Sequence, residues 1–269
     1  MPDVGIEKPC AESVELYQTV LAALHDGGIP FLVGGTYAME RLAGIARQTK
    51  DLDLFVRRGD WQRIAAALAK AGVTTEMTFA HWLGKAIAGH QFVDLIFANG
   101  NGVARVDEEW ITRGTPGIVL GFPVQICAAE EMVWSKSFVM ERERYDGADV
   151  LHILRSSARD IDWERLLRRF GDHAAVLLSH LVLFGYVYPD AAASIPEWVI
   201  DSLWSRRVVP TADGDRVCRG TLLSRTQYLV DVHGWGYTDA RLEPAGPMTE
   251  DEVAAWTAEV APSTMPSPV

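Results

Sequence analysis

The sequence predicts an α+β fold in which a mixed β-sheet flanked by helices is followed by a mainly helical C-terminal region. Up to about residue 127, segments with alternating apolar residues are interleaved with segments whose apolar residues recur at helical spacing. From residue 128 onward the helical spacing dominates. We therefore expect a sheet-containing domain over 1–127, a mainly helical domain over 128–260 and a disordered, proline-containing tail over 261–269.

Composition is that of a soluble globular protein. Of the 269 residues, 48% are hydrophobic and 23% are charged, and the net charge of −11 excludes a global basic surface for nucleic acid. Cys10, Cys127 and Cys218 lie far apart, without the spacing of a metal site or a disulfide framework. The uncharged run over 174–189 is too short to span a membrane, and the first residues carry no apolar signal. We expect a cytoplasmic protein without a membrane partner.

The N-terminal elements follow from local patterns. Ser13 is placed to cap a helix that ends at Gly27, and the apolar run over 29–33 predicts a buried strand. Thr36 is placed to cap the next helix, and Asp60 the one after it. Further strands are predicted over 51–56, 73–79, 82–88 and 92–97.

The C-terminal region contains five predicted helices, over 130–143, 148–155, 163–170, 173–187 and 198–206. On the helix that begins at Glu130, the residues Arg142, Asp146 and Asp149 fall at i, i+4 and i+7 and would share one face, with Lys136 two turns earlier. The alternative for this face is a solvated surface with internal salt bridges. An exposed turn is expected over 211–215.

Two aspartates, Asp51 and Asp53, lie two residues apart on the predicted strand over 51–56. Because successive side chains on a strand alternate between its faces, both carboxylates emerge on the same face. Two such charges about 4 Å apart repel by roughly 4 kcal/mol at an effective dielectric of 20, and a cation between them removes that cost. Oxygen ligands with open positions for phosphate and water suit Mg²⁺. The alternative is a half-exposed strand whose outer face is acidic.

Two further features accompany this pair. Gly34, Gly35 and Thr36 form a strand-to-helix turn, where backbone N–H groups and a helix N-terminus can hold a phosphate. Asp94 lies within an otherwise apolar strand, where an unpaired acid would cost several kcal/mol of desolvation. A neighbouring strand that places Asp94 beside Asp53 would complete a three-carboxylate cradle for one or two metal ions. The alternative for Asp94 is a strand-end carboxylate hydrogen-bonded to a turn.

The order of these residues resembles the nucleotidyltransferase superfamily that includes DNA polymerase β. Its signature is a glycine turn, a helix, an Asp-x-Asp pair on a strand and a third aspartate on a later strand, here Gly34-Gly35-Thr36, Asp51-Leu52-Asp53 and Asp94. The stretch around Arg47-Gln48-Thr49-Lys50 is most similar to the branch that contains the abortive-infection type IV toxin nucleotidyltransferases. The resemblance covers residues 31–154 and implies a nucleotidyltransferase-type mixed sheet flanked by helices.

The resemblance also implies roles for individual residues. It implies that Asp51, Asp53 and Asp94 bind Mg²⁺ or Mn²⁺, that they act in catalysis together with Lys136, and that Asp146 and Asp149 orient the acceptor or the lysine. The residues implied to bind the NTP substrate are Gly34, Gly35, Thr36, Thr49, Lys136, Arg142 and Arg144.

The expected reaction is transfer of a nucleoside monophosphate from an NTP to an acceptor hydroxyl, with release of pyrophosphate. The acceptor is either a small hydroxylated molecule or an RNA or tRNA end. The second case is toxin-like and implies an antitoxin protein as partner. The acidic net charge favours the small molecule. The alternative from another class is a catalytically silent nucleotide-binding or scaffold protein with the same fold.

Overall fold

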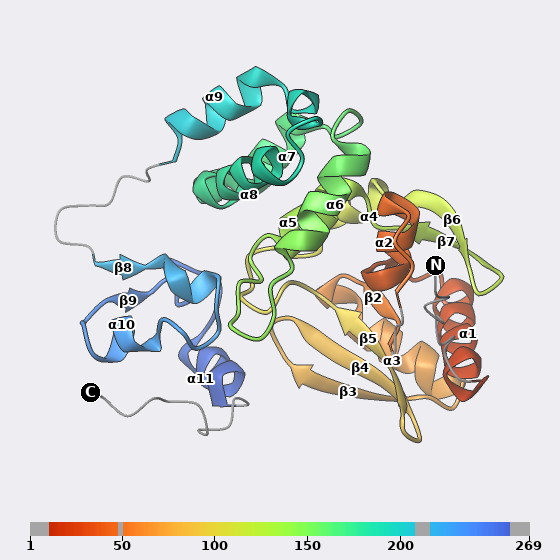
Figure 1. Ribbon diagram of the computed structural model, residues 1–269. Coiled ribbons are helices and arrows are strands. Elements are labelled where there is room, and N and C mark those ends of the chain that lie inside the picture. Colours follow the sequence, from red (N-terminus) through yellow and green to blue (C-terminus); the bar gives the residue numbers. More distant parts are fainter. Residues whose placement is uncertain (1–10, 48–50, 208–215, 259–269) are drawn as a thin grey trace.

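A computed structural model describes residues 11–47, 51–207 and 216–258 of the chain (Figure 1). Its centre is a seven-stranded sheet in the order β3-β4-β5-β2-β1-β7-β6. The strands are β1 (Leu32–Val33), β2 (Asp53–Phe55), β3 (Thr74–Phe79), β4 (Leu83–Ala88), β5 (Gln91–Ile96), β6 (Thr115–Val119) and β7 (Phe122–Ile126). The pairs β2–β5 and β1–β7 are parallel and the other pairs antiparallel, so the expected mixed sheet is confirmed.

Helices cover the sheet because each buries an apolar stripe. The helices of this part are α1 (Ala11–Asp26), α2 (Gly35–Ala43), α3 (Trp61–Lys70) and the short α4 (Glu108–Thr112). The first packs on β5 through residues such as Leu21 and Leu24, and α3 packs on α1 and β3 through Ile64 and Leu68. The second helix packs against α6 (Gly147–Ser157), so it joins the sheet to the helical region.

Two of the three predicted helix caps are misplaced, and the third holds its position without a capping hydrogen bond. The first helix already runs at Ala11, and the Ser13 hydroxyl donates to Oε1 of Gln91 at 2.5 Å instead of capping. The second helix begins at Gly35, so Thr36 lies inside its first turn. Asp60 does stand at the N-cap of α3, but its carboxylate accepts hydrogen bonds from guanidinium groups rather than from helix amides. Charged donors compete successfully with backbone N–H groups for a carboxylate.

The helical region comprises α5 (Ala129–Lys136), α6, α7 (Trp163–Phe170), α8 (Ala174–Val187) and α9 (Glu197–Ser205). The predicted helix over 130–143 is too long. The chain leaves the helix after Lys136 and forms a tight loop, closed by a bridge between Met140 and Tyr145 and a 3.1 Å hydrogen bond from the Asp146 amide to the Val139 carbonyl. Arg142, Asp146 and Asp149 therefore do not share one helix face.

The stretch Trp163–Val187, which contains α7 and α8, is long and apolar enough to span a membrane by length and composition alone. In the structure it lies within the helical region, and buried residues on both helices, among them Leu166, Phe170 and Phe184, are part of the hydrophobic core. We therefore interpret it as a core helix pair.

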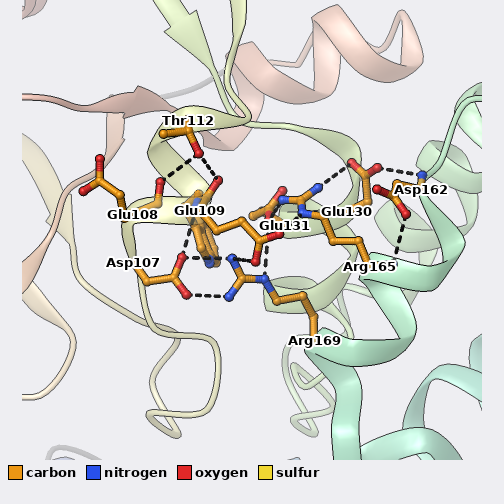
Figure 2. A network of polar contacts seen from close by, with 10 residues as sticks. Asp107, Glu108, Glu109, Thr112, Glu130, Glu131, Asp162, Arg165 and Arg169 are labelled. Atoms are coloured by element: carbon orange, nitrogen blue, oxygen red, sulfur yellow. Dashed lines mark hydrogen bonds and ion pairs between the residues drawn. The ribbon is translucent and has the colours of Figure 1, made fainter.

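Figure 2 shows a partly buried polar network that ties α4 to α5 and α7. Arg165, almost fully buried, contacts Glu131 and donates to Oε1 of Glu109 at 3.1 Å. Arg169 reaches Glu109 at 3.0 Å and Asp107, which also caps α4. Burial raises the pKa of Glu131 to about 7, although Arg165 acts against that shift. The network holds the segment after β5 against the helical region.

The C-terminal part is mainly helical, as expected, and also contains two short strands that were not predicted. It contains β8 (Val217–Cys218), β9 (Thr238–Asp239), α10 (Leu229–His233) and α11 (Glu250–Ala258), with β8 and β9 parallel. Short 3₁₀ helices are η1 (Arg58–Asp60), η2 (Gly171–His173), η3 (Ala192–Ser194) and η4 (Arg219–Leu222). Helix α11, dark blue in Figure 1, contacts β3. The predicted turn over 211–215 and tail over 261–269 lie outside the described residues.

Candidate active site

Three carboxylates converge where β2 and β5 run side by side. The two strands are parallel and place Asp53 directly opposite Asp94. Asp51 lies two residues before Asp53, and one carboxylate oxygen from each of the three residues lies within 4.8 Å of the other two. The structure therefore brings together the three acids that the sequence analysis singled out, with Asp53 and Asp94 on adjacent strands and Asp51 just before β2.

The three acids are held at an electrostatic cost. Burial, followed by repulsion from Asp51 and Asp94, raises the pKa of Asp53 to about 7. Burial also raises the pKa of Asp94, against the opposing effect of Lys85, whose Nζ lies 2.7 Å from Oδ1 of Asp94. A cluster of hard oxygen donors that repel one another in this way has the chemistry of a divalent-cation site.

The glycine turn touches the cluster directly. The Gly34 amide donates to the Asp53 carbonyl oxygen at 2.9 Å, which fixes the turn beside β2. Gly35 has a φ of +52°, and a β-carbon at this position would overlap Oδ2 of Asp53. Only glycine fits this close approach. Because α2 starts at Gly35, with Thr36 in its first turn, the positive end of the helix lies next to the carboxylates.

Two basic residues lie on the opposite wall of the same cleft. Lys136, at the end of α5, places Nζ 2.8 Å from oxygens of both Asp146 and Asp149. Arg144 donates to Asp146 at 2.9 Å. Burial acts to raise the pKa of Asp146, but the hydrogen bonds and charges of Arg144 and Lys136 outweigh it and hold that pKa below its usual range. The loop between α5 and α6 thus fixes both cations beside the triad.

Other predicted residues are not placed in the cleft. Arg142 is exposed on the loop after α5 and does not line it. The Asp149 carboxylate forms ion pairs with Lys136 and, at 2.6 Å, with Arg47. Asp149 does not line the cleft. Thr49 lies outside the described residues.

Sequence reasoning missed Lys85, which faces Asp94 across the antiparallel β4–β5 pair and lines the cleft. A lone lysine in an otherwise uncharged strand was the available signal, but its position beside Asp94 depends on strand register, which the sequence does not reveal.

The cleft has a volume of about 500 Å³ and runs from the triad toward the C-terminal part. One wall is the sheet between β2 and β3, and the opposite wall is α5 and the loop that follows it. The segment around Ser224 and the helix α11 complete it. A pocket of this size accommodates a small-molecule ligand.

The N-terminal part of the chain matches a protein-family model. Residues 16–95 match the model of the aminoglycoside-2″-adenylyltransferase family, which is less than a third of the chain. The matched segment contains the glycine turn and all three aspartates, and it ends before the basic residues on α5 and its loop. No curated protein matches the chain.

Similarities to solved structures are distant. The antibiotic-resistance factor ANT(2″)-Ia is 20% identical, with 63% of this chain and 96% of that chain covered at a TM-score of 0.44. A nucleotidyltransferase-like protein from Paracoccidioides brasiliensis is 16% identical, with 72% and 99% covered at a TM-score of 0.43. The lincosamide antibiotic adenylyltransferase LnuA is 12% identical, with 52% and 94% covered at a TM-score of 0.37.

The residues that match the family model also adopt a defined geometry. Within residues 16–95 the chain places a glycine turn at a helix N-terminus against an aspartate pair, and the third aspartate joins them from the adjacent strand. Residues 16–95 are therefore similar to a family of nucleotidyltransferases, in line with the resemblance seen in the sequence.

Proposed function

We propose that the protein transfers a nucleoside monophosphate from an NTP to a hydroxyl group of a small molecule and releases pyrophosphate. The observation that carries this proposal is the convergence of Asp51, Asp53 and Asp94 beside the Gly35 turn, within a cleft of small-molecule size. The match of residues 16–95 to a family named for adenylyl transfer supports the same reaction class.

The donor set fits a magnesium or manganese ion. The oxygens of Asp51, Asp53 and Asp94 are the hard ligands that these ions prefer. Burial, followed by repulsion from Asp51 and Asp94, raises the pKa of Asp53, and a dication would offset both costs. Such an ion, when bound, would supply neutralisation of the charge on the phosphates.

The chain's own residues supply positioning and proton transfer. The N-terminus of α2, with Gly35 and Thr36, would hold the phosphates that leave. The acceptor oxygen attacks the α-phosphorus, the bond between that phosphorus and the β-bridging oxygen breaks, and pyrophosphate departs. Asp94 would take the proton of the attacking hydroxyl, since its raised pKa brings it closer to the operating pH.

The basic residues on the opposite wall would act on the triphosphate. Lys136 and Arg144 are held in place by Asp146, so their charges are fixed before substrate arrives. Preorganised charges of this kind stabilise developing negative charge without reorganisation at the moment of reaction. Asp146 and Asp149 then act as positioning residues for Lys136.

We favour a small molecule over an RNA end as the acceptor. The net charge of −11 leaves little attraction for an RNA backbone, and the matched family is named for an aminoglycoside. Neither observation supports the toxin-like reaction or an antitoxin partner.

The test is incubation of the full-length protein with each labelled NTP, Mg²⁺ or Mn²⁺, and either a metabolite extract or total RNA. We expect pyrophosphate release and label in the metabolite fraction. Label in RNA would instead show that the acceptor is an RNA end and not a small molecule. Binding of NTP without pyrophosphate release under any of these conditions would instead indicate the silent nucleotide-binding alternative.

A further inference from the structure

The cleft continues beyond the triad into an aromatic end that the proposed reaction does not yet use. Phe79 and Trp82 stack at the turn between β3 and β4, with ring centroids 5.9 Å apart and an interplanar angle of 13°. Trp256 of α11 closes on them edge to face, 5.1 Å from Phe79 and 5.2 Å from Trp82. All three rings line the cleft. We call these three residues the aromatic wall.

Unsatisfied polar atoms accompany the aromatic wall. Among the described residues, Thr78 Oγ1, Trp82 Nε1 and Asn99 Nδ2 are buried without a hydrogen-bond partner, and all three residues line the cleft. A register shift between Met77 and Phe79 interrupts the β3–β4 ladder beside Thr78. Buried polar groups normally find partners, and bulges next to active sites often redirect side chains. These atoms are therefore placed to bind a polar edge of a ligand.

The charges along the cleft argue against a polycationic ligand. Outside the triad, the carboxylates that line it are those of Glu141, Glu143 and Asp146. Glu141 accepts from Ser224 Oγ at 2.5 Å and from the Arg225 amide at 2.7 Å.

Asp146 is held by Lys136 and Arg144. Glu143 is therefore the remaining cleft carboxylate without such an engagement among the described residues. The Arg225 guanidinium lies 4.5 Å from the Trp256 ring centroid, which adds positive charge at the aromatic end. A ligand with several ammonium groups would bring charges that this cleft does not pair.

The in-line geometry of phosphoryl transfer places the aromatic wall on the acceptor side of the site. In phosphoryl transfer the attacking and leaving oxygens are roughly in line, so the acceptor enters opposite the departing pyrophosphate. The helix α2 and the Gly35 turn, where pyrophosphate would leave, adjoin β1 and β2. The aromatic wall lies at the other side of Asp94, over β4 and β3 in the sheet order.

We infer that the aromatic wall is the acceptor subsite, and that the acceptor is a neutral or anionic hydroxylated compound with a flat apolar ring rather than a polycationic amino sugar. This inference rests on the proposed nucleotidyl transfer and names its acceptor class. Stacking on Trp256 would hold the ring, while Asn99 and the Trp82 indole N–H would bind its polar substituents.

Binding by the full-length protein tests the inference without turnover. Calorimetry with Mg²⁺ and a non-hydrolysable NTP analogue present would compare 4-nitrophenyl glucoside, methyl glucoside and tobramycin. We expect the aryl glucoside to bind at least tenfold more tightly than the other two. Trp256→Ala should remove that preference and Trp256→Phe should restore it, while the exposed Trp204→Ala serves as a matched control without effect.

Three outcomes would overturn the inference: tobramycin binding tightest, equal binding of the aryl and methyl glucosides, or Trp256→Ala weakening the NTP analogue instead of the acceptor. The last outcome would assign the aromatic wall to the nucleobase. Failure of the NTP analogue to bind the wild-type protein would contradict the proposed function itself, so the two failures are distinguishable.

Discussion

Two acidic clusters in this protein are built in opposite ways. In the network between α4, α5 and α7, buried Glu131 faces Arg165, and guanidinium groups match the carboxylates around them. In the triad, Asp53 forms no ion pair with a described residue, and Asp94 has a single lysine partner in Lys85. The first cluster carries its own counter-charges and holds elements together. In the second, Asp53 is buried without an ion-pair partner among the described residues, at a cost in stability.

The largest expected effect comes from the triad. Asp53→Asn keeps the shape of the side chain but removes its charge, so nucleotidyl transfer should fall at least about a thousandfold, on the order of 4 kcal/mol of transition-state stabilisation. Pyrophosphate release from labelled NTP measures it. Asp190→Asn, an exposed aspartate after α8, is the control and should retain full activity. Full transfer by Asp53→Asn would refute the proposed mechanism.

The paired cluster should respond in stability rather than in chemistry. Arg165→Met leaves Glu131 buried without its main counter-charge, and we expect a loss of about 3 kcal/mol in the free energy of unfolding. Urea denaturation measures it. Arg168→Met on the same helix changes an exposed arginine and should cost little. Equal losses in the two variants would show that the network does not contribute through charge pairing.

A smaller effect separates the basic residues near the triad. Lys136→Gln should raise the KM for NTP roughly tenfold, because the triphosphate loses one charged hydrogen-bond donor. Arg144 stays in place, since it is held by Asp146. Arg142→Gln, on the exposed part of the loop, should leave KM unchanged. Steady-state kinetics with varied NTP measures both. A larger rise for Arg142→Gln would reverse the assignment of the phosphate-binding residue.

The smallest effect is a pH-dependent difference in stability. Because the pKa of Asp53 is raised from 3.8 to about 7 in the folded protein, its contribution to stability is fully present below about pH 4 and is lost as the pH rises to about 7. Without metal, the Tm of Asp53→Asn should therefore exceed that of the wild type above pH 7, by several °C. Glu131 titrates in the same range but is present in both proteins.

Addition of Mg²⁺ should then raise the Tm of the wild type and not that of the variant, since a ligand that binds the folded state stabilises it. Thermal melts at pH 5 and pH 8, with EDTA or Mg²⁺, measure both effects. A constant difference between the proteins across pH would contradict the repulsion that we attribute to the triad.

What the sequence predicted well has short-range causes. Alternation over 51–56 and the apolar run over 92–97 identified two strands, and the desolvation cost of a lone acid in an apolar strand suggested that Asp94 lies beside Asp53. Helices with strong periodicity, such as Trp163–Phe170, were predicted with the observed bounds.

What could not be predicted depends on pairing between distant segments. β6 and β7 were not assigned, and the helix that continued past Lys136 in the prediction ends there because Arg144 and Asp146 organise the next loop. Strand register places Lys85 in the cleft, and the packing of α11 places Trp256 there. Neither register nor packing of a distant helix leaves a local pattern in the sequence. The aromatic wall was invisible for the same reason.

The position of β1 has a consequence for synthesis and for fragment design. Val33 pairs with Leu54 of β2 on one side and with Ile126 of β7 on the other, so the second partner of this strand emerges more than ninety residues after it. A nascent chain that stops at residue 95 carries every aspartate of the triad yet leaves one flank of β1 bare. The shortest autonomously folding piece must therefore extend past Ile126.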